Sequence, residues 1–507
     1  MSLAVRDPNV LYLNRVTEDV LSFGRANFLI DILFKDPQGF RLTPKVFTKT
    51  TMRMAPEDRI PSTSSKDHLP FFADRMDKAG DFVRDLIDYT KLQKMRSTYI
   101  GINKHTEYHP VSPLKNGKKY PKKAQDALEE AGVEFEVKPS NGEDRPASVK
   151  KKIKVGDNKL ILDQDGRPWW EESVTSTGFW KYLSPSNRVH SSFLLHGTVT
   201  GRTSSKNPNF QNVPKRGTTV RMAELVSAYR KTIVARPGHV LIEGDLSQAE
   251  LRIAAWMAGE PTMLRIYREG GDIHATTAAK VMGLTIEEFN ELPAKEKKAA
   301  RQKGKGVGFG YLFGMWWKAF RAYAKTNYGV DVTDAEAEQS REDFFELYSG
   351  LESWHEGMRR FSSEHGYVRA LHGSLRRLPS VRSSDEWVAK EAQRQAINSP
   401  VQRMASDIGL MGMTRFAQAC PWDRMHPIGF IHDAVVLEAR EEHAEEAMGA
   451  LKWFLQNPPL DWFDIESPIP ILSDVSVGTS LGSMEERPDI EAIRPAWTED
   501  KNLRIYV

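Results

Sequence analysis

The sequence predicts a mixed α/β fold (α+β) in which short antiparallel strands lie among long helices. The apolar run 240–242 reads as a buried strand, and it is followed by Asp245 and by the helix-like segment 246–253. A second segment, 427–437 (PIGFIHDAVVL), has two apolar runs on either side of an acid, Asp433. This pattern predicts a β-hairpin with the acid at its tip.

Two acids at separate strand ends form a candidate site for divalent cations. Magnesium favours one or two carboxylates together with substrate phosphates. Asp245 and Asp433 could hold two ions about 3.5–4 Å apart, an arrangement used in phosphoryl transfer. Taken alone, Asp245 is more typical of a helix N-cap, so the metal-site hypothesis depends on the second acid.

The segment 301–314 (RQKGKGVGFGYLFG) carries two cations and then two aromatic residues at intervals of four: Arg301, Lys305, Phe309 and Phe313. On a helix these side chains share one face, which would offer charge to a polyphosphate and a flat surface to a base. A solvated basic face that continues into core aromatics is the alternative. Four glycines lie inside this segment, at 304, 306, 308 and 310. Because each costs a helix about 1 kcal/mol relative to alanine, we expect a bent or mobile helix.

The ordered set of segments resembles DNA polymerase family A, the class of bacterial DNA polymerase I and many phage replicases. The similarity covers nearly all of residues 190–482. The segments that carry it are 245–252 (DLSQAELR, motif A), 301–314 (motif B), 432–433 (motif C), 200–214 (TGRTSSKNPNFQNVP), 272–274 (DIH) and 398–402 (NSPVQ).

The resemblance implies a right-hand polymerase fold with an antiparallel palm sheet, helical fingers and a helical thumb. The expected division is thumb 1–100, basic insertion and return to the thumb or palm 101–190, first palm part 191–272, fingers 273–375, second palm part 376–484 and a C-terminal extension 485–507.

The same resemblance implies template-directed addition of dNTPs to a primer 3′-hydroxyl. Asp245 and Asp433, with the backbone carbonyl of Leu246, would hold two Mg²⁺ ions, for which Mn²⁺ can substitute. Lys305 would donate a proton to the leaving pyrophosphate. The residues implied to bind the incoming dNTP are Arg301, Lys305, Phe309, His274, Glu250 and Gln248.

Glu250 matches the family residue that crowds the sugar 2′ position, which implies synthesis of DNA rather than RNA. By itself, a glutamate in a helix is usually a surface residue. Likewise, a lone histidine after Asp–Ile, as at His274, is usually a hydrogen-bonding residue at a helix start.

The resemblance also implies contacts with primer–template DNA. Arg394, Asn398 and Gln402 lie four apart in the predicted helix 386–407. There they would meet minor-groove acceptors that every base pair presents. The implied DNA-binding residues are Arg202, Asn212, Arg394, Asn398, Gln402, His432 and Phe313.

Three positions depart from the family pattern. Leu246 and Phe313 replace tyrosines, and Ala434 replaces the common second acid of motif C. Two alternatives therefore stay open. One is a single-subunit RNA polymerase-like enzyme, which Glu250 disfavours; the other is a catalytically weak DNA-binding scaffold.

Composition sets further limits. The chain has 507 residues, of which 40% are hydrophobic and 27% charged, and no apolar run is long enough to span a membrane. The single cysteine, Cys420, excludes an internal disulfide and a cysteine-based zinc site. We expect a cytoplasmic protein of a bacterium or a phage-infected cell, acting as a monomer. A net charge of +3 means that DNA affinity must come from local clustering of basic residues.

Two further features lie within the first 190 residues. The segment 81–98 predicts an amphipathic helix with a basic second half, and 101–159 has basic runs at 118–123 and 150–154. The basic runs are typical of a solvated or partly mobile surface that can attract DNA, or of a docking site for a processivity partner. Residues 1–100 show no paired-acid exonuclease motif, so we expect no proofreading by this chain. A separate exonuclease could then act as its partner.

Overall fold

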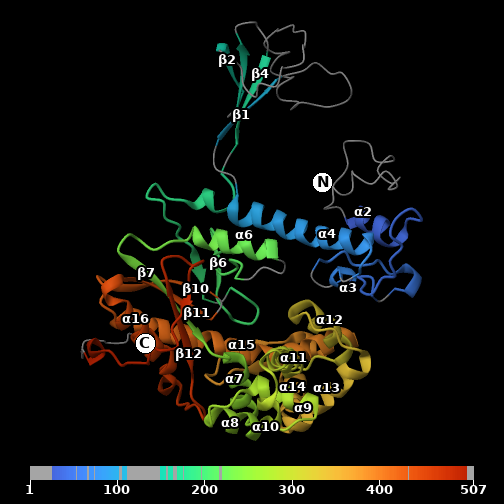
Figure 1. Cartoon of the computed structure of the whole chain (residues 1–507), viewed down its shortest axis with the longest axis vertical. Coiled ribbons are helices and arrows are strands. Elements are labelled where there is room, and N and C mark those ends of the chain that lie inside the picture. Colours follow the sequence, from blue (N-terminus) through green and yellow to red (C-terminus); the bar gives the residue numbers. More distant parts are fainter. Residues whose placement is uncertain are drawn as a thin grey trace. The chain divides into compact units, whose positions relative to one another are not determined.

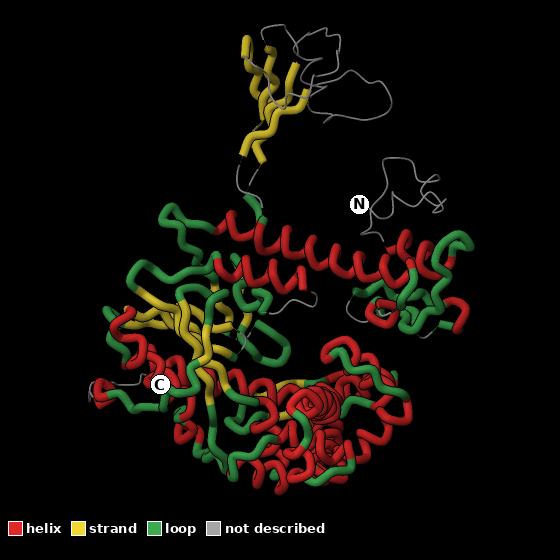
Figure 2. Tube along the Cα trace, viewed as in Figure 1, coloured by secondary structure: helices red, strands yellow, loops and turns green. Residues whose placement is uncertain are grey.

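The computed structural model describes residues 26–499 except 49, 53, 66–67, 74, 102–104, 111–148, 156–157, 164–167, 175, 196, 216–219 and 432. The chain divides into two compact units, one made of 1–90 with 193–507 and one of 91–192. Figure 1 labels their elements, and Figure 2 shows helices in red and strands in yellow.

The described helices are α2 (Ala26–Ile30), α3 (Pro70–Ala73), α4 (Lys78–Lys94), α6 (Val220–Lys231), α7 (Ala249–Ala258), α8 (Pro261–Arg268), α9 (Ile273–Met282), α10 (Ile286–Glu291), α11 (Ala294–Leu312), α12 (Trp317–Tyr328), α13 (Asp334–Leu347), α14 (Ser349–His365), α15 (Glu386–Ala419) and α16 (Ala444–Gln456). The described strands are β1 (His105–Pro110), β2 (Val149–Val155), β3 (Asn158–Asp163), β4 (Pro168–Val174), β5 (Ser192–Leu194), β6 (Ser204–Lys206), β7 (His239–Leu246), β8 (Tyr367–Arg369), β9 (Leu375–Arg377), β10 (Met425–Ile431), β11 (Ala434–Arg440), β12 (Ser473–Gly478) and β13 (Glu485–Glu486).

The main sheet of the larger unit has five strands in the order β10-β11-β7-β12-β13. Its four pairs of neighbouring strands are antiparallel. The predicted strand at 240–242 is part of β7, and the predicted hairpin is β10 and β11, so both predictions are confirmed. Asp433 lies in the hairpin turn, whereas His432 is outside the described residues.

The two faces of β7 differ in what covers them. A Cβ on Gly244 would lie 2.6 Å from a methyl group of Leu451 and 2.8 Å from one of Leu455, so α16 packs directly on this face. Because side chains alternate along a strand, Glu243 and Asp245 point to the opposite face. Core packing therefore decides which face of the sheet carries the acids.

Helix α11 is continuous over 19 residues despite its glycines. A Cβ on Gly304 would lie 2.4 Å from the carbonyl oxygen of His274 on α9, and one on Gly310 would lie 2.6 Å from the ring of Phe320 on α12. These two glycines therefore allow α9 and α12 to pack close to α11. Although a bent or mobile helix was expected, α11 has no break. Phe313 follows the last helical residue with φ −100° and ψ 22°, so it does not continue the helical face as expected.

The smaller unit contains an antiparallel sheet in the order β1-β4-β3-β2. The basic run 150–154 lies in β2, which pairs with β3, so this run belongs to a strand that the sequence analysis did not predict. The run 118–123 lies outside the described residues. Trp169 on β4 is buried, whereas Trp180 is 43% exposed.

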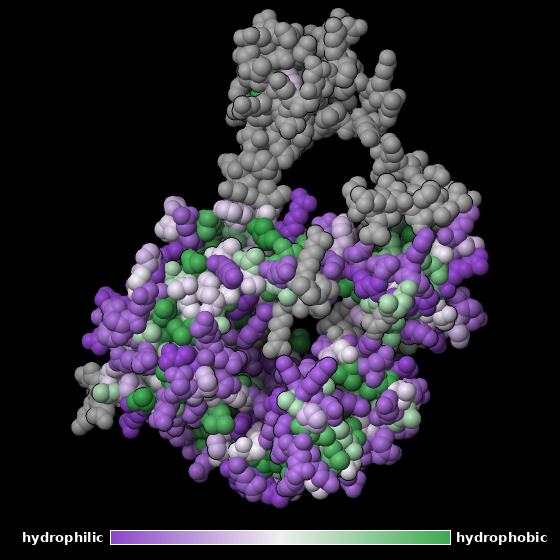
Figure 3. Space-filling model, viewed as in Figure 1, coloured by the Kyte–Doolittle hydropathy of each residue, from purple (hydrophilic) through white to green (hydrophobic). Residues whose placement is uncertain are grey.

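The predicted amphipathic helix at 81–98 is observed as α4, which is followed directly by a π-helix, Met95–Ile100. Among the described residues, no helix is both long and apolar enough to cross a membrane. On the face shown in Figure 3, hydrophilic residues predominate and apolar residues form small scattered patches. Scattered patches of this kind are normal for a folded protein surface.

The glycine packing of α11 gives a paired prediction. A Cβ on Gly308 would meet nothing within 4 Å, so Gly308→Ala should raise the free energy of unfolding by about 1 kcal/mol through helix propensity. Gly304→Ala should lower it by roughly 1–3 kcal/mol because the added methyl group overlaps α9. Urea denaturation of both variants measures the difference, and a change of the same sign in both would contradict the packing explanation.

Candidate active site

The pairing of β7 with β11 places the two predicted metal ligands beside each other. Ala434 lies directly opposite Asp245, and Asp433 is the residue immediately before Ala434. Asp245 belongs to β7, and Gln248 occupies the N-cap position of α7. The N-cap interpretation of Asp245 is therefore excluded.

The electrostatic environment of Asp245 suits a cation. Burial, and then the negative charge of Asp433, raise the pKa of Asp245 to about 6, while the ammonium group of Lys215 opposes this shift. Two carboxylates that repel each other form a donor set that a divalent cation would stabilise. In the described part of the chain, no three His, Cys, Asp or Glu side chains are grouped to hold a metal. Further ligands would have to come from backbone, water or substrate phosphates.

The immediate neighbours of Asp245 on the two flanking strands differ in charge. Ala434 on β11 is buried and offers no ligand, whereas Asp474 on β12 lies opposite Asp245 from the other side. The Ser247 hydroxyl donates a 2.6 Å hydrogen bond to Asp474. Leu246, the last residue of β7, is buried with its side chain in the core.

A second carboxylate and a lysine lie beside Asp245, and sequence analysis missed both. The ammonium nitrogen of Lys215 is 2.7 Å from Glu243 Oε1 and 3.6 Å from Asp245 Oδ2. The other oxygen of Glu243 is 3.7 Å from a guanidinium nitrogen of Arg230. The spacing of two between Glu243 and Asp245 in a predicted strand was a usable signal, because such residues share a face.

Glu250 and Arg202 form an ion pair, which joins a predicted sugar-contacting residue to a predicted DNA-contacting residue. The Glu250 side chain is only 17% exposed, so it is not an ordinary surface glutamate. Burial raises the pKa of Glu250, and the charge of Arg202 opposes the shift. Each residue is thus held by the other in the free protein.

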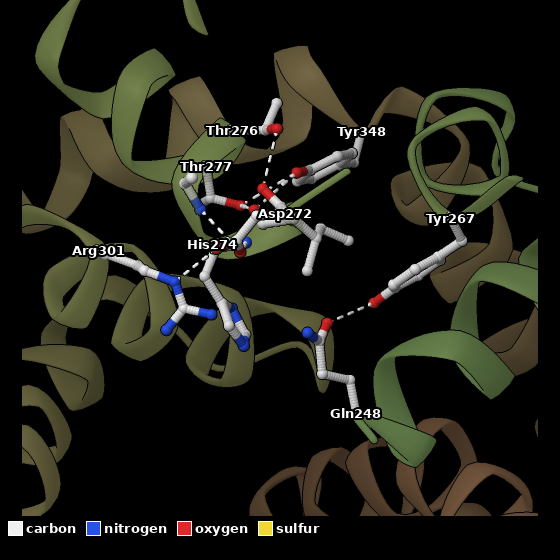
Figure 4. A network of polar contacts seen from close by, with 10 residues as sticks. Gln248, Tyr267, Asp272, His274, Thr276, Thr277, Arg301 and Tyr348 are labelled. Atoms are coloured by element: carbon white, nitrogen blue, oxygen red, sulfur yellow. Dashed lines mark hydrogen bonds and ion pairs between the residues drawn. The ribbon is translucent and has the colours of Figure 1, made fainter. Parts of the chain in front are cut away.

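Asp272 connects α9 to α11 through both of its carboxylate oxygens, as Figure 4 shows. One oxygen caps α9 by accepting hydrogen bonds from the backbone N–H groups of His274 (2.9 Å) and Ala275 (3.2 Å). The other accepts a 2.5 Å hydrogen bond from Arg301 Nε. Asp272 therefore fixes Arg301 relative to the start of α9, a role that sequence analysis did not assign.

His274 is buried at the start of α9 with its ring centroid 6.0 Å from that of Phe309. Burial, and then the positive charge of Arg301, lower the pKa of His274 to about 4. The imidazole is therefore neutral near pH 7. The backbone N–H of His274 donates a hydrogen bond to Asp272, as expected of a residue at a helix start. This contact leaves the ring available for the predicted contact with the dNTP.

Gln248 has an unusual backbone conformation, with φ 55° in the left-handed region. Its Oε1 accepts a 3.2 Å hydrogen bond from the hydroxyl of Tyr267 on α8 (Figure 4). This contact holds the side chain at the start of α7, two residues before Glu250.

Helix α15 spans 34 residues and carries Arg394, Asn398 and Gln402 at intervals of four, so the prediction of one shared helical face is confirmed. Arg394 pairs with Glu391 one turn earlier. The Oδ1 atom of Asn398 is buried and has no hydrogen-bond partner among the described residues. Asn212 lies in an exposed loop, where its backbone N–H donates to Asn209 at 3.3 Å.

Comparison with known proteins places this arrangement in a family. Residues 172–483 match the family described as DNA polymerase family A. The thermostable DNA polymerase I of Thermus filiformis is 35% identical over 299 residues, which are 58% of this chain and 32% of that protein. The DNA polymerase of Bacillus phage SP01 is 28% identical over 313 residues, 60% of this chain and 33% of that protein. The chain spans about a third of the length of these curated relatives.

A solved structure also matches. It is described as the POL domain of Pol1 from M. smegmatis in complex with DNA primer-template and dNTP. The TM-score is 0.52 with 24% sequence identity, and the match covers 60% of this chain and 50% of that chain. This likeness shows that the chain has the fold of that polymerase domain.

The double role of Asp272 can be separated by two substitutions. Asp272→Ala removes both the cap and the ion pair, and it should lower the free energy of unfolding by about 1 kcal/mol or somewhat more. Asp272→Ser keeps a capping hydroxyl, and it should lose less, because an ion pair between partly exposed side chains contributes roughly 0–1 kcal/mol. Urea denaturation measures both values, and equal losses would show that the cap contributes nothing.

Proposed function

Because the chain belongs to DNA polymerase family A, we propose that it is a template-directed DNA polymerase, which adds deoxynucleotides to a primer 3′-hydroxyl and releases pyrophosphate. The single observation that carries this proposal is the register of β7 and β11, which brings Asp433 within electrostatic reach of Asp245. The relatives named as DNA polymerases support it. The expected division into thumb, palm and fingers is part of the proposal.

Asp245, Asp433 and the backbone carbonyl of Leu246 would hold two Mg²⁺ ions, and Mn²⁺ can substitute for them. When bound, such ions lower the pKa of the primer 3′-hydroxyl and offset the charge of the triphosphate. The fit rests on the mutual repulsion of the two carboxylates. Ala434 supplies no ligand, so substrate phosphates would complete the coordination that Asp245 and Asp433 begin.

The basic face of α11 would receive the triphosphate. Arg301, held by Asp272, and Lys305, one turn further on, supply positive charge to the phosphates. Lys305 would also donate a proton to the departing pyrophosphate. The neutral ring of His274 would donate a hydrogen bond rather than a charge, and Phe309 would pack against the nucleotide.

The sugar and the growing duplex would be contacted from α7 and α15. Glu250 would crowd the 2′ position of the incoming sugar, and Arg202 would leave Glu250 to reach the DNA. Arg394, Asn398 and Gln402 carry hydrogen-bond donors, as the acceptor-rich minor groove requires. Such contacts test the geometry of a base pair without reading its identity.

The partners that follow are primer–template DNA and dNTPs. The four lysines of β2 would add electrostatic attraction for the DNA backbone. A separate exonuclease or processivity partner, a monomeric state and a cytoplasmic setting in a bacterium or phage-infected cell also belong to this proposal.

Primer extension on a defined template with Mg²⁺ tests the function. Asp245→Ala and Asp433→Ala should each lower the extension rate by orders of magnitude, because positioning and charge neutralisation contribute most of the catalysis, while primer–template binding persists. Extension by the wild-type protein with NTPs as fast as with dNTPs would favour the RNA polymerase alternative. Binding without extension would favour the scaffold.

Sugar discrimination gives a second test. Glu250→Ala opens space beside the 2′ position and should raise the incorporation of ribonucleotides relative to deoxynucleotides by roughly tenfold or more. Glu250→Gln keeps the size but loses the charge that pairs with Arg202, so it serves as the control for loss of the ion pair. Equal discrimination by the wild-type protein and Glu250→Ala would exclude this role.

A further inference from the structure

A lysine lies at the edge of the proposed metal site. The ammonium nitrogen of Lys215 contacts Glu243 at 2.7 Å and lies 3.6 Å from Asp245. Both acids are on the same face of β7. The Lys215 side chain is 53% exposed, so its flexible four-carbon stem has room to move.

Glu243 is the fixed member of this group. Its side chain is only 9% exposed, and its residue position lies between Val436 on β11 and Ser476 on β12. Arg230 approaches its second oxygen to 3.7 Å and is itself anchored by a 3.0 Å hydrogen bond from Nε to the carbonyl of Leu481. Lys215 therefore lies within reach of two carboxylates, of which Glu243 is the more buried.

The charge of Lys215 would repel a metal ion bound to Asp245. A divalent ion bound to Asp245 would meet the ammonium group a few ångströms away, and like charges at that distance repel strongly in a partly buried site. The residue opposite Asp245 on β11 is Ala434, which carries no charge, so the carboxylates that could offset the repulsion are Asp433 and Asp474, the latter opposite Asp245 on β12. The ammonium group has an alternative partner in Glu243.

We propose that Lys215 competes with the metal ion for Asp245, and that Glu243 draws the ammonium group aside when the ion binds. Lys215 and Glu243 are then positioning residues that set the metal affinity of the site. The inference rests on the proposed function, since it assumes that Asp245 holds a metal ion.

Direct metal binding tests the competition. Wild-type protein and variants are bound to a primer–template whose primer ends in a dideoxynucleotide, so that no extension occurs, and free Mn²⁺ is followed by electron paramagnetic resonance. Asp245→Ala defines the binding that depends on the site. Lys215→Met should lower the Kd for Mn²⁺ by roughly three- to tenfold, because it removes the repelling charge. Lys215→Arg keeps the charge and should bind nearly as the wild-type protein does.

Glu243→Gln should change the Kd for Mn²⁺ in the direction opposite to Lys215→Met. It leaves Lys215 with Asp245 as its carboxylate partner, and it should raise the Kd for Mn²⁺ by a similar factor. In the Lys215→Met background the same Glu243→Gln change should raise the Kd by a smaller factor, because only the direct attraction between Glu243 and the ion is then lost. The Mg²⁺ concentration for half-maximal extension should shift in the same directions.

Each outcome decides between the proposals. Mn²⁺ binding that is lost in Asp245→Ala but unchanged or weakened in Lys215→Met would overturn the competition and leave the proposed function standing. Wild-type protein without Asp245-dependent Mn²⁺ binding would overturn both the metal site and this inference. Circular dichroism of each variant confirms folding; because Lys215 is largely exposed, Lys215→Met decides the matter even if Glu243→Gln unfolds.

Discussion

The antiparallel pairing of β7 with β11 is the interaction on which the candidate site depends. A slip of one residue would turn Glu243 and Asp245 toward α16 and carry Gly244 to the open face. Such a slip is opposed by the close contact of Gly244 with Leu451 and Leu455. The packing of the core thus specifies the register, and the register specifies where the two carboxylates meet.

The cationic side of the site is held by a different kind of constraint. Helix α11 is positioned by close packing against α9 at Gly304 and by the carboxylate of Asp272, which binds both the start of α9 and Arg301. Neither contact involves the sheet. The acids and the cations are therefore placed by separate elements, so that a change in one need not displace the other.

Local patterns predicted β7, the β10–β11 hairpin and α15, because apolar alternation and helical spacing are properties of neighbouring residues. The Lys215–Glu243 and Arg202–Glu250 contacts were missed, because they join positions 28 and 48 residues apart and depend on tertiary packing. The strand β2 was missed because its three consecutive lysines, at 150–152, interrupt the apolar alternation by which a strand is recognised in a sequence. Phe313 was placed on the helix, but the chain turns at Gly314, whose φ of +70° ends α11.

The free protein already pairs several side chains that are proposed to contact substrate. Arg301 is paired with Asp272, Arg202 with Glu250, and Asp245 lies beside Lys215. Binding of DNA, nucleotide or metal would exchange these internal contacts for new ones, so each new contact contributes only the difference between two states. A ligand that binds one side chain of an ion pair breaks the pair. The other side chain must then bind a second ligand or be solvated by water. Selectivity would then arise because only a complete set of ligands compensates both members of every pair.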